Sequence, residues 1–271
     1  MGKELLRQLL PALEKMTFTG AEALTPAGYT VFEVGRDQVD AYRGDPGTLA
    51  EALRTFQTAD SLPYKYTGVA LTALAAARQA DGSYAPEGLE ASLQWLEKAQ
   101  ELAPDVTDIN VVEGFIYIYS DRLDDARLVL DYLHEQDSMH YYVARAEIVY
   151  WRSRGDLRQA LQWAEQAIQW AATLPQRLRV RSIMAEIYDA LGDHQAALQS
   201  YREALHFDPD NAWIWNRVAL LQWQAGAAEE ARSANEKALQ LNPALAEAQE
   251  LQQAMNAGAD RGGLFGRLFS S

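Results

Sequence analysis

Small and turn-forming residues recur at a fixed spacing of 34 positions in the second half of this sequence. The recurring pairs are Gly192 with Gly226, Ala197 with Ala231, Ala204 with Ala238, and Pro209 with Pro243. Upstream, the same spacing joins Tyr117 to Trp151, Asp121 to Gly155, and Ala126 to Ala160. A period of this length is typical of proteins built from stacked supersecondary units. Within each unit, apolar residues at helical spacing predict two helices, the first ending near the glycine and the second before an Asp/Asn-Pro turn.

The units at 178–211 and 212–245 resemble the tetratricopeptide repeat (TPR), a helix–turn–helix whose two helices cross at small residues. In the second unit the matching positions are Trp215, Val218, Ala219, Gly226, Ala231, Ala238 and Pro243. In the first they are Met184, Ala185, Tyr188, Gly192, Ala197, Tyr201, Ala204 and Pro209. The resemblance implies an all-α fold, a TPR-type α-solenoid wound as a right-handed superhelix with a concave and a convex side. Because only neighbouring units bury each unit's apolar face, the array also needs a capping helix.

The period predicts the organisation of the chain. The repeat array covers 64–245, in units 64–106, 107–140, 141–177, 178–211 and 212–245. The flanking segments are an N-terminal helix and connection at 1–27, a degenerate repeat at 28–63, a capping helix at 246–258 and a flexible apolar tail at 259–271. Within the degenerate repeat, Tyr29, Val31 and Glu33 alternate with Thr30, Phe32 and Val34, a pattern compatible with an extended segment at 28–35.

Charge is unevenly distributed along the chain. The net charge is −14 and the pI is about 4.7, which excludes nucleic acid as a partner because phosphate binding needs a dominant basic field. Residues 86–138 hold three basic and thirteen acidic side chains, whereas residues 139–188 hold seven arginines and four acids. We call these segments the acidic block and the basic block. Neighbouring copies of the chain could pair through them.

Three absences in the sequence indicate a cytoplasmic protein. The chain has no cysteine, which excludes disulfides and thiolate chemistry and agrees with a reducing compartment. Charged residues interrupt the apolar face of the first helix, so we expect no signal peptide. No apolar run is long enough to predict a transmembrane segment.

Catalysis finds no support in the motifs. The four histidines, His134, His140, His194 and His206, lack the spacing of a metal site. No glycine-rich phosphate loop or nucleophile motif is present. We therefore expect no enzyme activity, no cofactor and no metal.

The TPR resemblance implies that the first helix of each unit lines a concave groove. Projecting the groove positions onto this sequence gives eight candidates, most of them aromatic or arginine, the residue types that dominate binding energy at interfaces. They are Phe115, Tyr142, Arg145, Arg152, Arg179, Trp213, Asn216 and Trp223. The lysine and asparagine pattern by which some TPR proteins grip a carboxylate end is absent apart from Asn216 and Arg217.

These features predict a non-catalytic scaffold or adaptor that binds a protein or peptide partner in the groove of its TPR array. The alternative is a structural protein that forms a homo-oligomer through the charged blocks or the apolar tail. The tail candidates for docking are Leu264, Phe265, Leu268 and Phe269, four large apolar residues in a segment without a core of its own.

Overall fold

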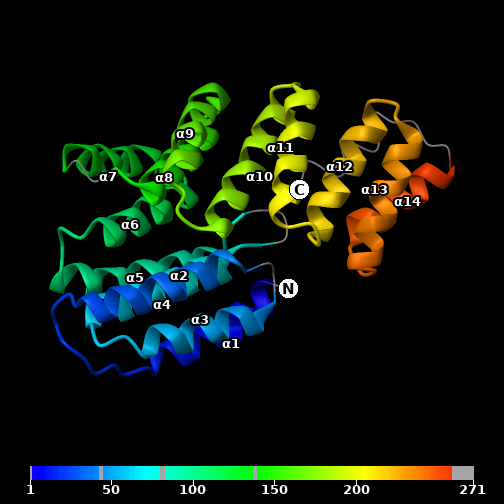
Figure 1. The fold of residues 1–271 in the computed structure, drawn as a ribbon. Helices are drawn as coiled ribbons and strands as arrows, with labels where there is room; N and C mark the ends of the chain where they lie inside the picture. Colours follow the sequence, from blue (N-terminus) through cyan, green and yellow to red (C-terminus); the bar gives the residue numbers. More distant parts are fainter. Residues whose placement is uncertain (1, 43–44, 80–82, 137–138, 258–271) are drawn as a thin grey trace. The chain divides into compact units, whose positions relative to one another are not determined.

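The computed structural model describes residues 2–42, 45–79, 83–136 and 139–257, and within them all regular structure is helical. The helices are α1 Gly2–Glu14, α2 Pro26–Asp40, α3 Pro46–Gln57, α4 Leu62–Ala77, α5 Pro86–Leu102, α6 Thr107–Tyr119, α7 Leu123–Glu135, α8 Tyr141–Ser153, α9 Leu157–Trp170, α10 Leu174–Ala190, α11 His194–Phe207, α12 Ala212–Gln224, α13 Ala228–Leu241 and α14 Ala246–Ala257 (Figure 1). Two isolated β-bridges join Ala21 to Ser61 and Arg78 to Tyr84. The predicted all-α fold is confirmed.

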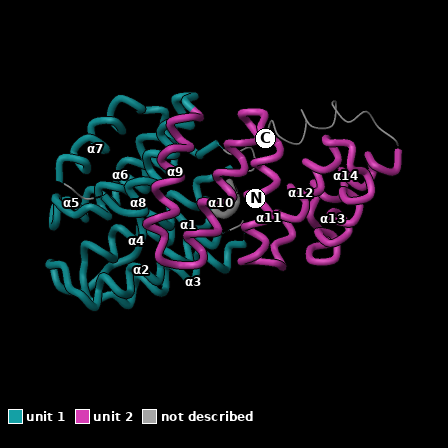
Figure 2. The backbone as a smooth tube through the Cα atoms, turned by 45° about the horizontal axis from the view of Figure 1, so that its top comes forward, with its two compact units in different colours: residues 1–156 teal, residues 157–271 magenta. Residues whose placement is uncertain are grey.

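The helices divide into two compact units, Met1–Asp156 and Leu157–Ser271 (Figure 2). Unit 1 contains α1 to α8, and unit 2 contains α9 to α14. In unit 1, α2 packs on α3, α4 on α5, and α6 on α7 as helical hairpins; in unit 2, α10 packs on α11, and α12 on α13. This is the helix–turn–helix organisation of TPR repeats.

The recurring turn position has a common backbone geometry. Gly155, Gly192 and Gly226 have φ angles of 79°, 81° and 83°, and Asp121 at the equivalent place has a φ of 58°. After Gly192, the Asp193 N–H donates to the Tyr188 carbonyl at 2.8 Å, and the Gly192 N–H donates to Asp189 at 2.9 Å. This pair of bonds is the Schellman motif, which requires a left-handed residue and therefore favours glycine. The same pair closes the other three turns, so the motif accounts for the glycine period.

Small residues mark the places where the two helices of a hairpin cross. The second-helix alanines Ala126, Ala197 and Ala231 are fully buried. A larger side chain at such a position would overpack the contact between helices. The alanine period thus reflects close helix approach.

The prediction of an extended segment at 28–35 is wrong, because these residues lie within α2. Pro26 begins this helix, and the Thr25 hydroxyl accepts the Gly28 N–H at 2.9 Å as an N-cap. The buried residues of α2 are Gly28, Phe32, Gly35 and Arg36. Their spacing of three to four residues is helical, and it outweighs the short alternation of apolar and polar residues.

Phe56 of α3 fixes the contact between α2 and α4 in unit 1. Its ring is 1% exposed and packs against two glycines, Gly35 of α2 and Gly68 of α4. A Cβ atom added at Gly35 would lie 2.4 Å from the ring, and one added at Gly68 would lie 2.2 Å from it. The absence of side chains at these two positions lets both helices approach the ring.

Helix α14 packs on α13 and α12. Its buried residues are Ala248, Leu251, Ala254 and Met255. Leu251 and Met255 belong to the apolar cluster that also contains Trp223 of α12. The last hairpin of unit 2 is therefore covered on its apolar side.

Candidate functional site

Three groove candidates, Phe115, Tyr142 and Arg145, come together in unit 1, on α6 and α8. The Arg145 guanidinium lies 5.3 Å from the centre of the Phe115 ring, a cation–π contact. Arg145 Nη1 also lies 2.6 Å from Asp40 Oδ1, at the end of α2. Burial lowers the pKa of Arg145, but Asp40 and the surrounding tyrosines raise it above the ordinary value, so the guanidinium stays charged.

Side chains of α2 also cover Tyr142. The Arg36 guanidinium stacks 3.6 Å from the centre of the Tyr142 ring and forms an ion pair with Asp108 of α6. The Tyr142 hydroxyl donates to Asp37 Oδ1 at 3.4 Å. Burial raises the pKa of Asp37, and the nearby Asp40 carboxylate raises it further. Within unit 1, the groove candidates Tyr142 and Arg145 of α8 are thus covered by the chain's own α2.

A buried carboxylate joins α7 to α8 in the same unit. Glu147 has no exposed surface, and its two oxygens accept from the two terminal nitrogens of Arg127 at 2.9 and 3.2 Å. His134 Nε2 lies 3.0 Å from the same carboxylate. Such a bidentate pair fixes the packing of two helices, and removing either partner would strand a buried charge.

In unit 2, Asn216 and Trp223 lie in the interior. Asn216 is fully buried, and its Nδ2 donates to Asn235 of α13 at 3.3 Å. Asn235 in turn donates to the Ala248 carbonyl of α14 at 2.9 Å. Trp223 is 6% exposed within the cluster shared with α14. The sequence projection placed these residues in a groove because it could not show how α14 packs on α12.

The remaining candidates keep exposed surface. Trp213 and Arg179 are half-buried, on α12 and α10, and Arg152 is exposed at the end of α8. The Arg217 guanidinium lies 4.9 Å from the centre of the Trp213 ring, and Tyr201 meets Trp213 edge-on. The tail candidates Leu264, Phe265, Leu268 and Phe269 lie outside the described residues.

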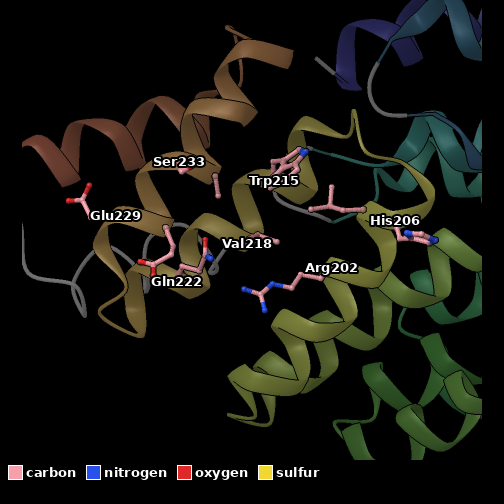
Figure 3. Close-up of a pocket in the computed structure, with 10 residues that line it drawn as sticks. Arg202, His206, Trp215, Val218, Gln222, Glu229 and Ser233 are labelled. Carbon is pink, nitrogen blue, oxygen red and sulfur yellow. The ribbon is translucent and has the colours of Figure 1, made fainter.

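Unit 2 also contains a cleft that the sequence did not indicate, between α11, α12 and α13. Its volume is about 770 Å³, and Figure 3 shows Arg202 and His206 on α11, Glu229 on α13, and Trp215, Val218 and Gln222 of α12 between them. Glu230 and Ser233 complete the α13 wall. The sequence projection missed this cleft because it followed only the first helix of each repeat.

Two features are absent from the described residues. None of their His, Asp and Glu side chains form a group of three or more that could hold a metal ion. Among the same residues, no helix has the length and apolar character needed to cross a membrane.

Comparison with known proteins agrees with the geometry. A family model described as "TPR repeat" matches residues 185–226, from the middle of α10 to the turn after α12. No curated protein matches the chain in sequence.

Several solved structures share the fold at low identity. The pilF protein of Pseudomonas aeruginosa matches with a TM-score of 0.59 at 16% identity, over 77% of this chain and 92% of that one. The APC/C hetero-tetramer Cut9–Hcn1 matches with a TM-score of 0.62 at 14% identity, over 94% of this chain and 46% of that one. A signal transduction ATPase with a tetratricopeptide repeat sensor from Pyrococcus horikoshii matches with a TM-score of 0.58 at 16% identity, over 93% of this chain and 39% of that one.

The repeated left-handed turns, the buried alanines and the matched repeat at residues 185–226 show that the chain has the TPR fold. TPR repeats build scaffolds for protein interaction, and this chain has that scaffold.

Proposed function

We propose that this protein is a non-catalytic adaptor that binds a segment of a partner polypeptide on the first-helix face of unit 2. The main observation behind this proposal is that Trp213 is half-exposed and that the Arg217 guanidinium stacks on its ring. Aromatic and arginine side chains contribute most to binding energy at protein interfaces.

Arg179 supports the same face. It lies 34 positions before Trp213, so the two residues occupy equivalent places on the first helices of consecutive repeats. In unit 1, Arg152 is the candidate with exposed surface, whereas Phe115, Tyr142 and Arg145 are engaged by α2 or by each other. The proposal therefore rests on Arg179 and Trp213, and the binding role of the buried candidates stays a prediction from the sequence.

Charge pairing between copies is the weaker alternative. Three ion pairs inside unit 1 use charges of the blocks: Asp108 with Arg36, Arg145 with Asp40, and Glu147 with Arg127. Mass measured in solution at low and high salt separates the two functions. A monomer in both conditions supports the adaptor, and an oligomer that dissociates as salt rises supports self-association, because salt screens exposed charge pairs.

The adaptor proposal is tested with matched substitutions. The full chain serves as bait, and a captured partner is then purified and titrated calorimetrically against Arg179→Ala and Trp213→Ala. Each variant should weaken binding by about 2 kcal/mol, which is roughly 30-fold. Arg158→Ala and Trp170→Ala alter exposed residues of α9 and should change affinity by less than about 0.5 kcal/mol. If both groove variants fold normally and bind as tightly as the parent, the proposal is wrong.

A further inference from the structure

The cleft of unit 2 has walls of opposite charge. Arg202 and His206 are four residues apart on α11, so they project from one side of that helix. Glu229 and Glu230 lie in the first turn of α13 on the opposite wall. Trp215 and Val218 form an apolar floor. A volume of about 770 Å³ is in the range of sites that take several side chains of a ligand.

The floor also holds a polar group that points to a ligand. Gln222 is 9% exposed, and its buried Oε1 has no hydrogen-bond partner among the described residues. A buried acceptor left without a donor destabilises the chain by about 1–3 kcal/mol, so a donor from an occupant would remove that cost. Among the ion pairs of the described residues, Glu229 is paired with Arg232 of its own helix at 2.7 Å, whereas Arg202 and Glu230 take part in none. The cleft therefore offers an acceptor, a cation and an anion around an apolar floor.

The C-terminal end of α14 lies close to the anionic wall. Helices α13 and α14 are joined by residues 242–245 and run antiparallel, with Asn235 Nδ2 3.5 Å from Gln252 Oε1. Glu230 is five residues before Asn235, and Ala257 is five residues after Gln252, so each lies about 7.5 Å along its helix from that contact. The chain beyond Ala257 therefore begins at the level of Glu230.

The sequence of residues 258–271 complements the cleft. It carries Leu264, Phe265, Leu268 and Phe269 for an apolar floor, and its two cations are Arg261 and Arg267. The six residues 258–263 span at most about 20 Å when extended, which exceeds the diameter of about 10–12 Å of the intervening helix. The cationic side chains of α11 repel Arg261 and Arg267, and the acidic side chains of α13 attract these two arginines. The tail arginines should therefore face the α13 wall of the cleft.

We propose that the cleft between α11, α12 and α13 is a docking site for an apolar, arginine-bearing segment, and that residues 258–271 of the same chain are its occupant. Phe265 and Phe269 pack on Trp215 and Val218, and the tail supplies the donor for Gln222. The site goes beyond the proposed function, because it lies between the second helices of two repeats and uses none of the groove candidates.

Disulfide trapping in the full-length chain tests the proposal, since the protein has no cysteine of its own. The test pair is Ser233→Cys on the cleft wall with Ser270→Cys in the tail. The control pair is Glu250→Cys, at an exposed position of α14, with the same Ser270→Cys. Positions 233 and 250 both lie on folded helices, so both loops are closed by the same residues after Ala257, and a tail that does not dock should react with the two positions at similar rates. Docking should favour position 233, and we expect the test pair to form its intramolecular disulfide about 10-fold faster than the control pair.

Two further variants test the chemistry of docking in the same assay. Phe265→Ser combined with Phe269→Ser should abolish the preference for position 233. Glu230→Lys should slow the test pair several-fold, whereas Glu236→Lys, at an exposed position of the same helix outside the cleft, should leave it unchanged.

Three outcomes overturn the proposal. A control pair that reacts as fast as the test pair means that the tail does not occupy the cleft, which then belongs to another polypeptide. A disulfide that forms only between two chains means that the occupant is the tail of a second copy. A serine-substituted tail that retains the preference for position 233 means that the apolar side chains do not hold it there.

Discussion

Replacing Gly68 with alanine should destabilise unit 1, although alanine favours helix formation. The added Cβ would lie 2.2 Å from Cγ of the Phe56 ring, whereas carbon atoms in contact prefer separations of about 3.5–4.0 Å. The ring has no free direction of retreat, because it is 1% exposed and Gly35 packs on it from α2. Moving the ring therefore requires α2 and α4 to separate.

The expected magnitude follows from two opposing contributions. Overpacking a closed core costs about 1–3 kcal/mol, and a contact this short should lie at the upper end. Replacing a helical glycine with alanine by itself stabilises the helix by about 1 kcal/mol. We expect Gly68→Ala to lower the free energy of unfolding by about 2 kcal/mol, measured by urea denaturation followed by circular dichroism.

Gly114→Ala provides the matched control. Gly114 is also buried within a helix, α6, but a Cβ added there would meet its nearest heavy atom, Val129 Cγ1, at 3.8 Å. This variant should gain about 1 kcal/mol, so the two alanine variants should shift stability in opposite directions. Combining Gly68→Ala with Phe56→Leu should reduce the penalty of the glycine substitution. A Gly68→Ala protein as stable as the parent would refute the packing argument.

Three further predictions concern both units. Trp223→Ala should lower the free energy of unfolding by about 3–5 kcal/mol because its ring is buried, whereas Trp170→Ala, at a site 37% exposed, should have a small effect on urea denaturation. Ala231→Leu should destabilise unit 2 by about 1–3 kcal/mol at the fully buried helix crossing, and an unchanged thermal midpoint would contradict the repeat register. Burial, partly offset by Asp108, lowers the pKa of His140, whose Nδ1 accepts the Tyr142 N–H at the start of α8. Because the folded protein favours the neutral imidazole, this contribution to stability is present above the unfolded pKa of about 6.5 and is lost as the pH falls below it. An asparagine at position 140 would cap the helix without titrating. His140→Asn should therefore reduce the difference in the free energy of unfolding between pH 7.5 and pH 5.5.

The sequence by itself determined the helices and the repeat, because the signals for both are local. Gly192 and Gly226 recur because the Schellman turn needs a left-handed residue, and Ala197 and Ala231 recur because helices cross there. Each requirement is met within one hairpin, so it repeats with the hairpin. The 28–35 prediction failed where a short alternation was given more weight than the longer helical spacing of Phe32 and Gly35.

The surfaces were decided by tertiary structure, because the contacts that cover or open them join distant parts of the chain. Arg36 meets Asp108 across 72 positions, and Asp40 meets Arg145 across 105. Such pairs leave no periodic trace, so the sequence could not show that α2 covers Tyr142 and Arg145. Likewise Asn216 is fully buried, and hydrogen bonds connect it through Asn235 of α13 to the Ala248 carbonyl of α14. A repeat position specifies the direction of a side chain from its own helix, and only the packing of other helices decides whether that side chain reaches solvent.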